Sequence, residues 1–128
     1  MTYQQWLDRY RAAWIERDAD AAAALFTADA VYREQPFAAP FTGRSAIREY
    51  WSTVTRSQSD IDLQYGTPVV AGARVAVEWW TTLLNDGAPL TIAGEFLLRF
   101  DDDGLCRELR EYWVVSEGKA APPPGWGA

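Results

Sequence analysis

The side chains that could carry chemistry in this sequence are carboxylates and phenols, because it contains no histidine. Without histidine, a Ser-His or Cys-His dyad and a His-ligated zinc or iron site are excluded. The lone Cys106 can form neither an internal disulfide nor a cysteine cluster for a metal. An acid or base must be Asp, Glu, Tyr, Lys or Cys, and we expect a site with no cofactor and no metal.

Glu34 is the first candidate, because it lies where a short strand gives way to a loop. The residues from Ala30 to Glu34 alternate as a half-buried strand does, and Pro36 and Pro40 prevent a regular ladder beyond that point. A strand end holds a residue still while the following loop gives a substrate access. The alternative is a solvated carboxylate at a strand end.

Tyr10 is the second candidate, because it lies on an apolar helix face. Apolar residues recur at helical spacing and predict a helix over residues 3–17, in which Trp6, Tyr10 and Trp14 are one turn apart each. A phenol is thus set between two indoles that point the same way. The alternative is an ordinary core tyrosine whose hydroxyl is bonded elsewhere.

Glu111 is the third candidate, because it interrupts the apolar side of the strand predicted over Leu105–Val115. Its neighbours on that side are Leu109 and Trp113. A carboxylate there must be paired, protonated or in a wet pocket, and we expect its pKa to be raised by desolvation and by the charge of Glu34. The alternative is a bulge that shifts the register by one residue and puts Glu111 in solvent.

Three helices followed by long hairpins must position these side chains. After the first helix, Asp18 or Asp20 can cap a short second helix through Phe26, and a third opens at Thr42 and Gly43. Four strands are then predicted, over Ile61–Val70, Ala73–Leu84, Leu90–Asp101 and Leu105–Val115. This order predicts an α+β domain in which a curved antiparallel sheet wraps around the three N-terminal helices.

Composition limits the possible partners. The 128 residues predict a single domain over 1–118, followed by a Pro/Gly-rich tail over 119–128 whose Trp126 is either docked or disordered. The net charge of −6 and the lack of a basic run exclude nucleic acid. No signal sequence is recognisable and no apolar run approaches the roughly 20 residues of a membrane span, so we expect a cytoplasmic protein that does not bind membranes.

Three stretches resemble the SnoaL-like polyketide cyclases and ketosteroid isomerases of the nuclear transport factor 2-like superfamily. They are RDADAAAALF, the loop leading into GRSAIREYW, and LLRFDDDG followed by RELREYW, and the resemblance covers residues 1 to about 116. It implies a cone-shaped α+β barrel whose open end admits a small, mostly apolar ligand. It also implies a homodimer.

The resemblance places the catalytic tyrosine of the ketosteroid isomerases on Tyr10 and their proton-shuttling aspartate on Glu34. Their second donor, a protonated aspartate, falls on Phe96, which cannot donate, and a supporting tyrosine falls on Trp51. A protonated Glu111 could replace the missing donor, as a neutral carboxylic acid does in ketosteroid isomerase.

Together these features predict a proton-transfer enzyme of isomerase, cyclase or dehydratase type that acts on a small apolar carbonyl compound. Glu34 would be the base, Tyr10 a donor and Glu111 the replacement donor. The ring-lined pocket would be formed by Trp6, Trp14, Phe37, Phe41, Trp51, Trp79, Phe96 and Trp113.

Two alternatives remain from other classes of protein. The first is a binding protein of the same fold without chemistry. The second is a scaffold dimer, because Trp80 and Tyr112 alternate away from the helices and would place large rings on the convex sheet face. That face is also where we expect the homodimer to form.

Overall fold

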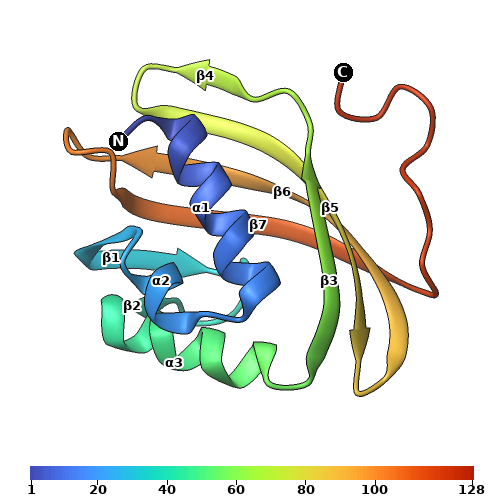
Figure 1. Cartoon of the computed structure of the whole chain (residues 1–128). Helices are drawn as coiled ribbons and strands as arrows, with labels where there is room; N and C mark the ends of the chain where they lie inside the picture. The colour runs from blue at the N-terminus through green and yellow to red at the C-terminus, as the bar shows by residue number, and fades with distance from the viewer.

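The computed structural model describes all 128 residues, and it contains three helices and a curved seven-stranded sheet (Figure 1). The helices are α1 (Tyr3–Glu16), α2 (Ala19–Ala23) and α3 (Arg44–Thr55). The strands are β1 (Phe26–Arg33), β2 (Phe41–Thr42), β3 (Gln58–Tyr65), β4 (Val69–Ala71), β5 (Arg74–Asn85), β6 (Ala88–Phe100) and β7 (Cys106–Glu117). The predicted α+β class is confirmed.

Local sequence signals fix both ends of α1. The Thr2 hydroxyl accepts from the Gln5 backbone N–H at 3.2 Å, and the Gln5 side chain accepts from the Thr2 N–H at 2.9 Å, which completes a capping box. Arg17 ends the helix in the left-handed conformation. The helix therefore has nearly the predicted bounds.

The second helix is shorter than predicted. Asp18 caps it by accepting from the Ala21 N–H at 3.0 Å, but it ends at Ala23. Phe26 does not close this helix, as we had expected, because it is fully buried as the first residue of β1. Five helical residues are enough to turn the chain from α1 into the sheet.

The sheet has the strand order β2-β1-β7-β6-β5-β3, with β4 also paired to β5. Strands β3, β5, β6 and β7 form the antiparallel meander that the sequence predicted. The pairing of β1 with β7 is parallel, so the sheet is mixed and the purely antiparallel expectation is wrong. This pairing joins distant segments, and no local pattern reports it.

The hairpin between β5 and β6 closes with two residues in the left-handed region. Asp86 has φ 50° and Gly87 has φ 81°, and Asn85 pairs with Ala88 on either side of them. This is the type I′ geometry that an Asp-Gly pair favours in tight hairpins. It sets the register between β5 and β6.

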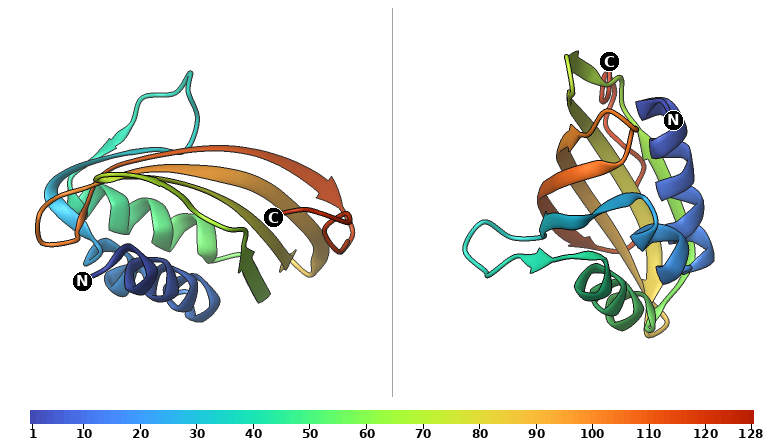
Figure 2. Two further views of the ribbon diagram at one scale, coloured as in Figure 1. Left: turned by 90° about the horizontal axis from the view of Figure 1, so that it is seen from above. Right: turned by 90° about the vertical axis from the view of Figure 1, so that its left-hand side faces the viewer.

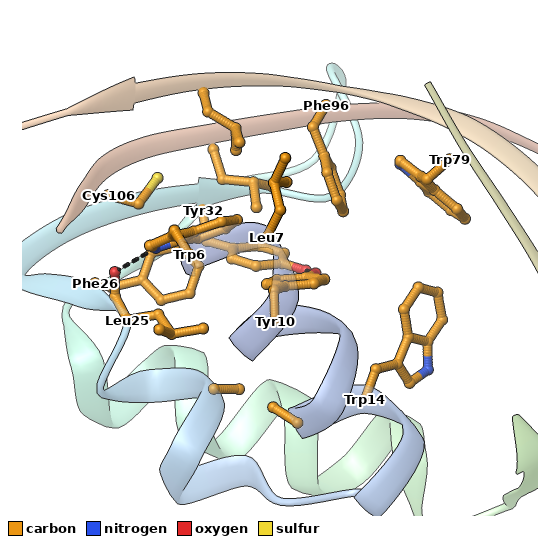
Figure 3. Close-up of a cluster of buried hydrophobic side chains, with 14 of the residues drawn as sticks. Trp6, Leu7, Tyr10, Trp14, Leu25, Phe26, Tyr32, Trp79, Phe96 and Cys106 are labelled. Carbon is orange, nitrogen blue, oxygen red and sulfur yellow. Dashed lines mark hydrogen bonds between the residues drawn. The ribbon is translucent and has the colours of Figure 1, made fainter. Parts of the chain in front are cut away.

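The helices lie on the concave side of the sheet, which curves over them (Figure 2). The face of α1 that points to the sheet is buried and carries Trp6, Leu7, Tyr10, Ala13 and Trp14. Figure 3 shows Trp6, Leu7, Tyr10 and Trp14 packed beneath the inner face of the sheet. None of the three helices combines the length and apolar character needed to cross a membrane.

The tail after β7 folds back onto the outer face of the sheet. The Trp80 indole N–H donates to the Ala120 carbonyl at 2.8 Å. The rings of Trp80 and Trp126 meet edge to face at 5.8 Å. Of the two states expected for Trp126, the structure therefore has the docked one.

Candidate active site

A cavity of about 280 Å³ lies between the helices and the inner face of the sheet. Its lining comes from α1, β1, α3 and the meander strands, and 12 of its 16 residues are hydrophobic. Seven aromatic rings line it, those of Tyr10, Trp14, Tyr32, Tyr50, Trp51, Trp79 and Trp113. The polar side chains among the lining residues are Thr55, Gln58, Asn85 and Glu111.

A chain of three polar side chains crosses one wall of this cavity. The hydroxyl oxygens of Tyr10 and Tyr32 are 3.0 Å apart, and the Tyr32 hydroxyl donates to Oε1 of Glu111 at 3.5 Å. The three side chains come from α1, β1 and β7. Strands β1 and β7 run side by side and carry Tyr32 and Glu111, and the Tyr10 side chain reaches Tyr32 from α1.

Glu111 is the buried acid of this chain. Its residue is only 8% exposed, because strand alternation turns it to the inner face between Leu109 and Trp113. Its pKa is raised to about 8, mainly by burial and also by the charge of Glu34, while the Tyr32 hydrogen bond opposes the rise. The inner-face register predicted for this strand is the one that the structure has.

Glu34 lies directly after β1, at the start of the loop that we predicted from its prolines. Arg33 pairs with Arg110 in parallel register, which puts Glu34 next to Glu111 along the two strands. The Trp113 indole donates to the Glu34 carbonyl at 2.9 Å. Glu34 is half-buried and its pKa is raised by burial, but it is not among the residues that line the cavity.

The phenols of the site stay protonated. Burial raises the pKa of Tyr10 and of Tyr32 well above the ordinary value, and the charge of Glu111 raises both further. Burial also raises the pKa of Tyr50, and the charges of Glu111 and Glu34 add to the rise. Each phenol can therefore donate a hydrogen bond at neutral pH.

Four of the eight rings predicted for the pocket do line it: Trp14, Trp51, Trp79 and Trp113. Trp113 is partly exposed, whereas Trp51 and Trp79 are buried. The Trp14 indole donates to the Gln58 side chain at 2.8 Å, and the Trp51 and Trp79 indoles have no hydrogen-bond acceptor. Both indole rings are packed against other aromatic rings of the interior.

Three further rings pack behind the wall. Trp6 stacks on Tyr10 at 5.1 Å and donates to the Leu25 carbonyl at 2.8 Å (Figure 3). Phe96 is fully buried against the rings of Tyr10 and Trp79. Phe41 packs on the cavity ring Tyr50 at 4.4 Å. They support the cavity rings and do not line the cavity.

Phe37 is the one predicted pocket residue that lies far from this interior. It is 98% exposed in the loop between β1 and β2, which projects away from the body of the protein (Figure 2). An apolar side chain in a Pro-rich loop has no strand partner that would turn it inward. Its assignment to the pocket is wrong.

Tyr32 is the functional candidate that our sequence analysis missed. The signal was present, because Tyr32 lies between Ala30 and Glu34 in the alternating strand and therefore shares their face.

No group of three or more Cys, Asp or Glu side chains lies close enough together to hold a metal ion.

The sequence model of the SnoaL-like domain matches residues 7–109. A comparison with curated proteins found no match. Among solved structures, a similar fold occurs in SalBIII, an epoxide hydrolase/cyclase-like enzyme in pyran ring formation in the polyether salinomycin. The TM-score is 0.78, with 20% identity over 89% of this chain and 94% of that chain.

Two further structures have this fold. A hypothetical protein from Catenulispora acidiphila with a ketosteroid isomerase-like fold, in complex with trimethylamine, gives a TM-score of 0.76 and 23% identity over 88% of this chain and 86% of that one. An LEH-like epoxide hydrolase from M. tuberculosis gives a TM-score of 0.72 and 17% identity, over 86% of this chain and 80% of that one. At these identities the likeness shows the fold alone.

Proposed function

Since the chain belongs to the SnoaL-like domain family, we propose that it is a cofactor-free proton-transfer enzyme of isomerase, cyclase or dehydratase type. Its substrate would be a small apolar carbonyl compound bound in the cavity. The observation that carries this proposal is the carboxyl group of Glu111, which is buried on the wall of an aromatic cavity and accepts from Tyr32. Perturbed acids in such places are the usual sites of acid–base chemistry.

Glu111 would act as the hydrogen-bond donor to the substrate oxygen. Because its pKa is raised to about 8, it holds its proton at neutral pH. Its Oε1 accepts from Tyr32, and no protein group donates to Oε2. A protonated oxygen in a cavity with few other polar groups can stabilise charge that develops on a carbonyl oxygen.

Glu34 would act as the base. It is the less buried of two neighbouring carboxyl groups, and its charge helps to keep the proton on Glu111. Two adjacent acids in different environments divide into one that stays protonated and one that stays ionised. Trp113, which lines the cavity, donates to the backbone carbonyl of Glu34, so the half-buried Glu34 side chain would meet a substrate at the rim of the cavity.

The reaction requires no group from outside these residues. The Glu34 carboxylate takes a proton from a carbon next to the carbonyl, and the electron pair moves onto the carbonyl oxygen. Glu111 donates its proton to the resulting enolate oxygen, and the Tyr10–Tyr32 hydroxyl pair supports Glu111 from behind through the bond to Oε1. Glu34 then returns the proton to a different carbon in an isomerisation. In a cyclisation the enolate attacks a second carbonyl and Glu34 protonates the new alkoxide, and in a dehydration the hydroxyl group that is expelled takes the proton from Glu34 and leaves as water.

The size and charge of the cavity restrict the substrate. A cavity of roughly 150 Å³ accommodates benzene, so about 280 Å³ suits a compound of two fused rings. No Arg or Lys side chain lines the cavity, whereas Glu111 does. A carboxylate or phosphate on the substrate would have no counter-ion there.

A binding protein without chemistry is the second candidate. Phe96 favours it, because this buried ring occupies the inner face of β6 where the resemblance expects a donor. Deuterium exchange into an enolisable ketone separates the two functions, since a binding protein would not accelerate it.

A further inference from the structure

The cavity combines many aromatic rings with a carboxyl group and has no basic side chain. Seven aromatic rings and Glu111 line it, and Glu34, which is not a lining residue, acts on Glu111 through its charge. Aromatic faces carry negative potential and attract cations, most strongly where water is excluded. The same surroundings offer nothing to an anion.

We propose that this cavity binds a small organic cation, such as a tertiary or quaternary alkylammonium ion, with Glu111 as its counter-ion. The inference goes beyond the proposed function, because it concerns binding and holds whether or not the protein turns over a carbonyl compound. It assigns a second class of ligand to the same cavity.

The arrangement of the rings suits a rounded cation. The planes of Tyr10 and Trp51 are 90° apart, and those of Trp14 and Trp79 are 70° apart. Figure 3 shows Tyr10 and Trp14 on α1 and Trp79 opposite them on the sheet. Rings turned in several directions can enclose an alkylammonium group from several sides, as aromatic cages do.

The carboxyl group is incompletely satisfied by the protein. Glu111 is more than nine-tenths buried, it accepts one long hydrogen bond of 3.5 Å from Tyr32, and its second oxygen has no donor. The hydroxyls of Tyr10 and Tyr50 are neutral and supply no charge. A ligand cation would provide the charge partner that the cavity lacks.

Two arginines near Glu111 belong to a different pocket. Arg33 and Arg110 line a separate pocket of about 150 Å³ that also reaches Glu111. Arg110 is paired there with Glu108 at 3.1 Å. Neither guanidinium lines the aromatic cavity, and the only charge that acts on the pKa of Glu111 is that of Glu34.

Binding of a cation must therefore be linked to a proton. A cation beside Glu111 favours the ionised form, so binding expels the proton that the free protein holds below pH of about 8. The affinity should rise as the pH rises toward 9 and fall toward pH 6. A neutral ligand of the same shape has no reason to follow this trend.

Choline and 3,3-dimethylbutan-1-ol form a matched test pair, because they have nearly the same shape and differ in charge. Tryptophan fluorescence and calorimetric titration at pH 6 and pH 9 would measure both affinities. At pH 9 we expect choline to bind at least about tenfold more tightly than the alcohol, and at pH 6 we expect a smaller preference for choline. Calorimetry in buffers of different ionisation enthalpy should show a proton released on binding at pH 7.

Glu111→Gln should reduce the preference for the cation at least several-fold, whereas Glu95→Gln, on the exposed face of β6, should leave it unchanged. Melting curves establish that both variants are folded. Equal affinity for the two compounds, no binding of choline at millimolar concentration, or a preference that survives in Glu111→Gln would each overturn the proposal. None of these readouts depends on catalysis, so they leave the proposed function to its own test.

Discussion

Tyr32 and Glu111 are 79 positions apart in the sequence, and the Tyr32 hydroxyl donates to Oε1 of Glu111 at 3.5 Å. The contact exists because β1 and β7 are parallel neighbours in which Tyr32 pairs with Leu109, two residues before Glu111 on the same face. The hydroxyl oxygen of Tyr10, on α1, lies 3.0 Å from that of Tyr32.

Glu111→Gln should stabilise the protein at neutral pH. The pKa of Glu111 is raised from 4.5 to about 8, so the folded state keeps a proton that the unfolded state loses. The contribution of Glu111 to the free energy of unfolding is fully present below about pH 4.5 and is lost as the pH rises to about 8. Glutamine removes that loss, and we expect a gain of about 1–3 kcal/mol at pH 7.5.

Thermal and urea unfolding between pH 4 and 9 measure this gain. The difference between wild type and Glu111→Gln should grow with pH, whereas Glu95→Gln should run parallel to wild type. A constant difference across the range would mean that Glu111 does not hold its proton in the folded state.

Tyr32→Phe should raise the pKa of Glu111 further, because the Tyr32 hydrogen bond favours the ionised carboxylate. It also leaves the buried Tyr10 hydroxyl without its partner, which should cost about 1–3 kcal/mol of stability. NMR titration of the glutamate carboxyl carbons would follow the pKa. Tyr112→Phe on the outer face is the control, and an unchanged Glu111 titration in Tyr32→Phe would contradict the contact.

Gly94→Ala should push Trp79 out of its place on the cavity wall. A Cβ atom at Gly94 would lie 2.5 Å from Cζ2 of Trp79 and 2.8 Å from the Tyr112 carbonyl oxygen. We expect a loss of about 1–3 kcal/mol in stability and weaker binding of any ligand in the cavity. In a Trp79→Leu background the alanine should cost less, and an equal cost in both backgrounds would exclude the clash with Trp79.

A homodimer through the convex sheet face remains our expectation for the oligomeric state. Tyr112 is 47% exposed and Val114 is 71% exposed, whereas the tail covers part of Trp80. Sedimentation should give twice 14.4 kDa, and Val114→Glu should halve it while Val69→Glu on β4 should not. A wild-type monomer at micromolar concentration would rule out this interface.

Residues that repeat with a regular period were predictable in their orientation. The helical stripe of α1 placed Tyr10 inside, and the two-residue alternation of β7 placed Glu111 on the inner face. The Asp86-Gly87 turn fixed a hairpin, because few other dipeptides adopt its backbone angles. These signals are local, so the sequence contains them in full.

Depth within the fold and distant pairing were not predictable. Alternation turns both Phe96 and Trp79 inward, but it does not say that Phe96 packs behind the wall that Trp79 lines. Phe37 belongs to a loop with no period at all. The parallel pairing of β1 with β7, which joins Tyr32 to Glu111, depends on the path of the whole chain.

The most direct measurement of the proposed chemistry is proton NMR of 2-tetralone, a two-ring enolisable ketone, incubated with the protein in deuterium oxide. We expect exchange next to the carbonyl above the buffer rate, falling as the pH rises through about 8 where Glu111 loses its proton. Glu34→Gln should reduce the exchange rate by about 10²-fold or more. Glu111→Gln should abolish the fall in rate at high pH. Glu95→Gln should change neither the rate nor its dependence on pH. Exchange no faster than in buffer, or a full rate in Glu34→Gln, would contradict the account.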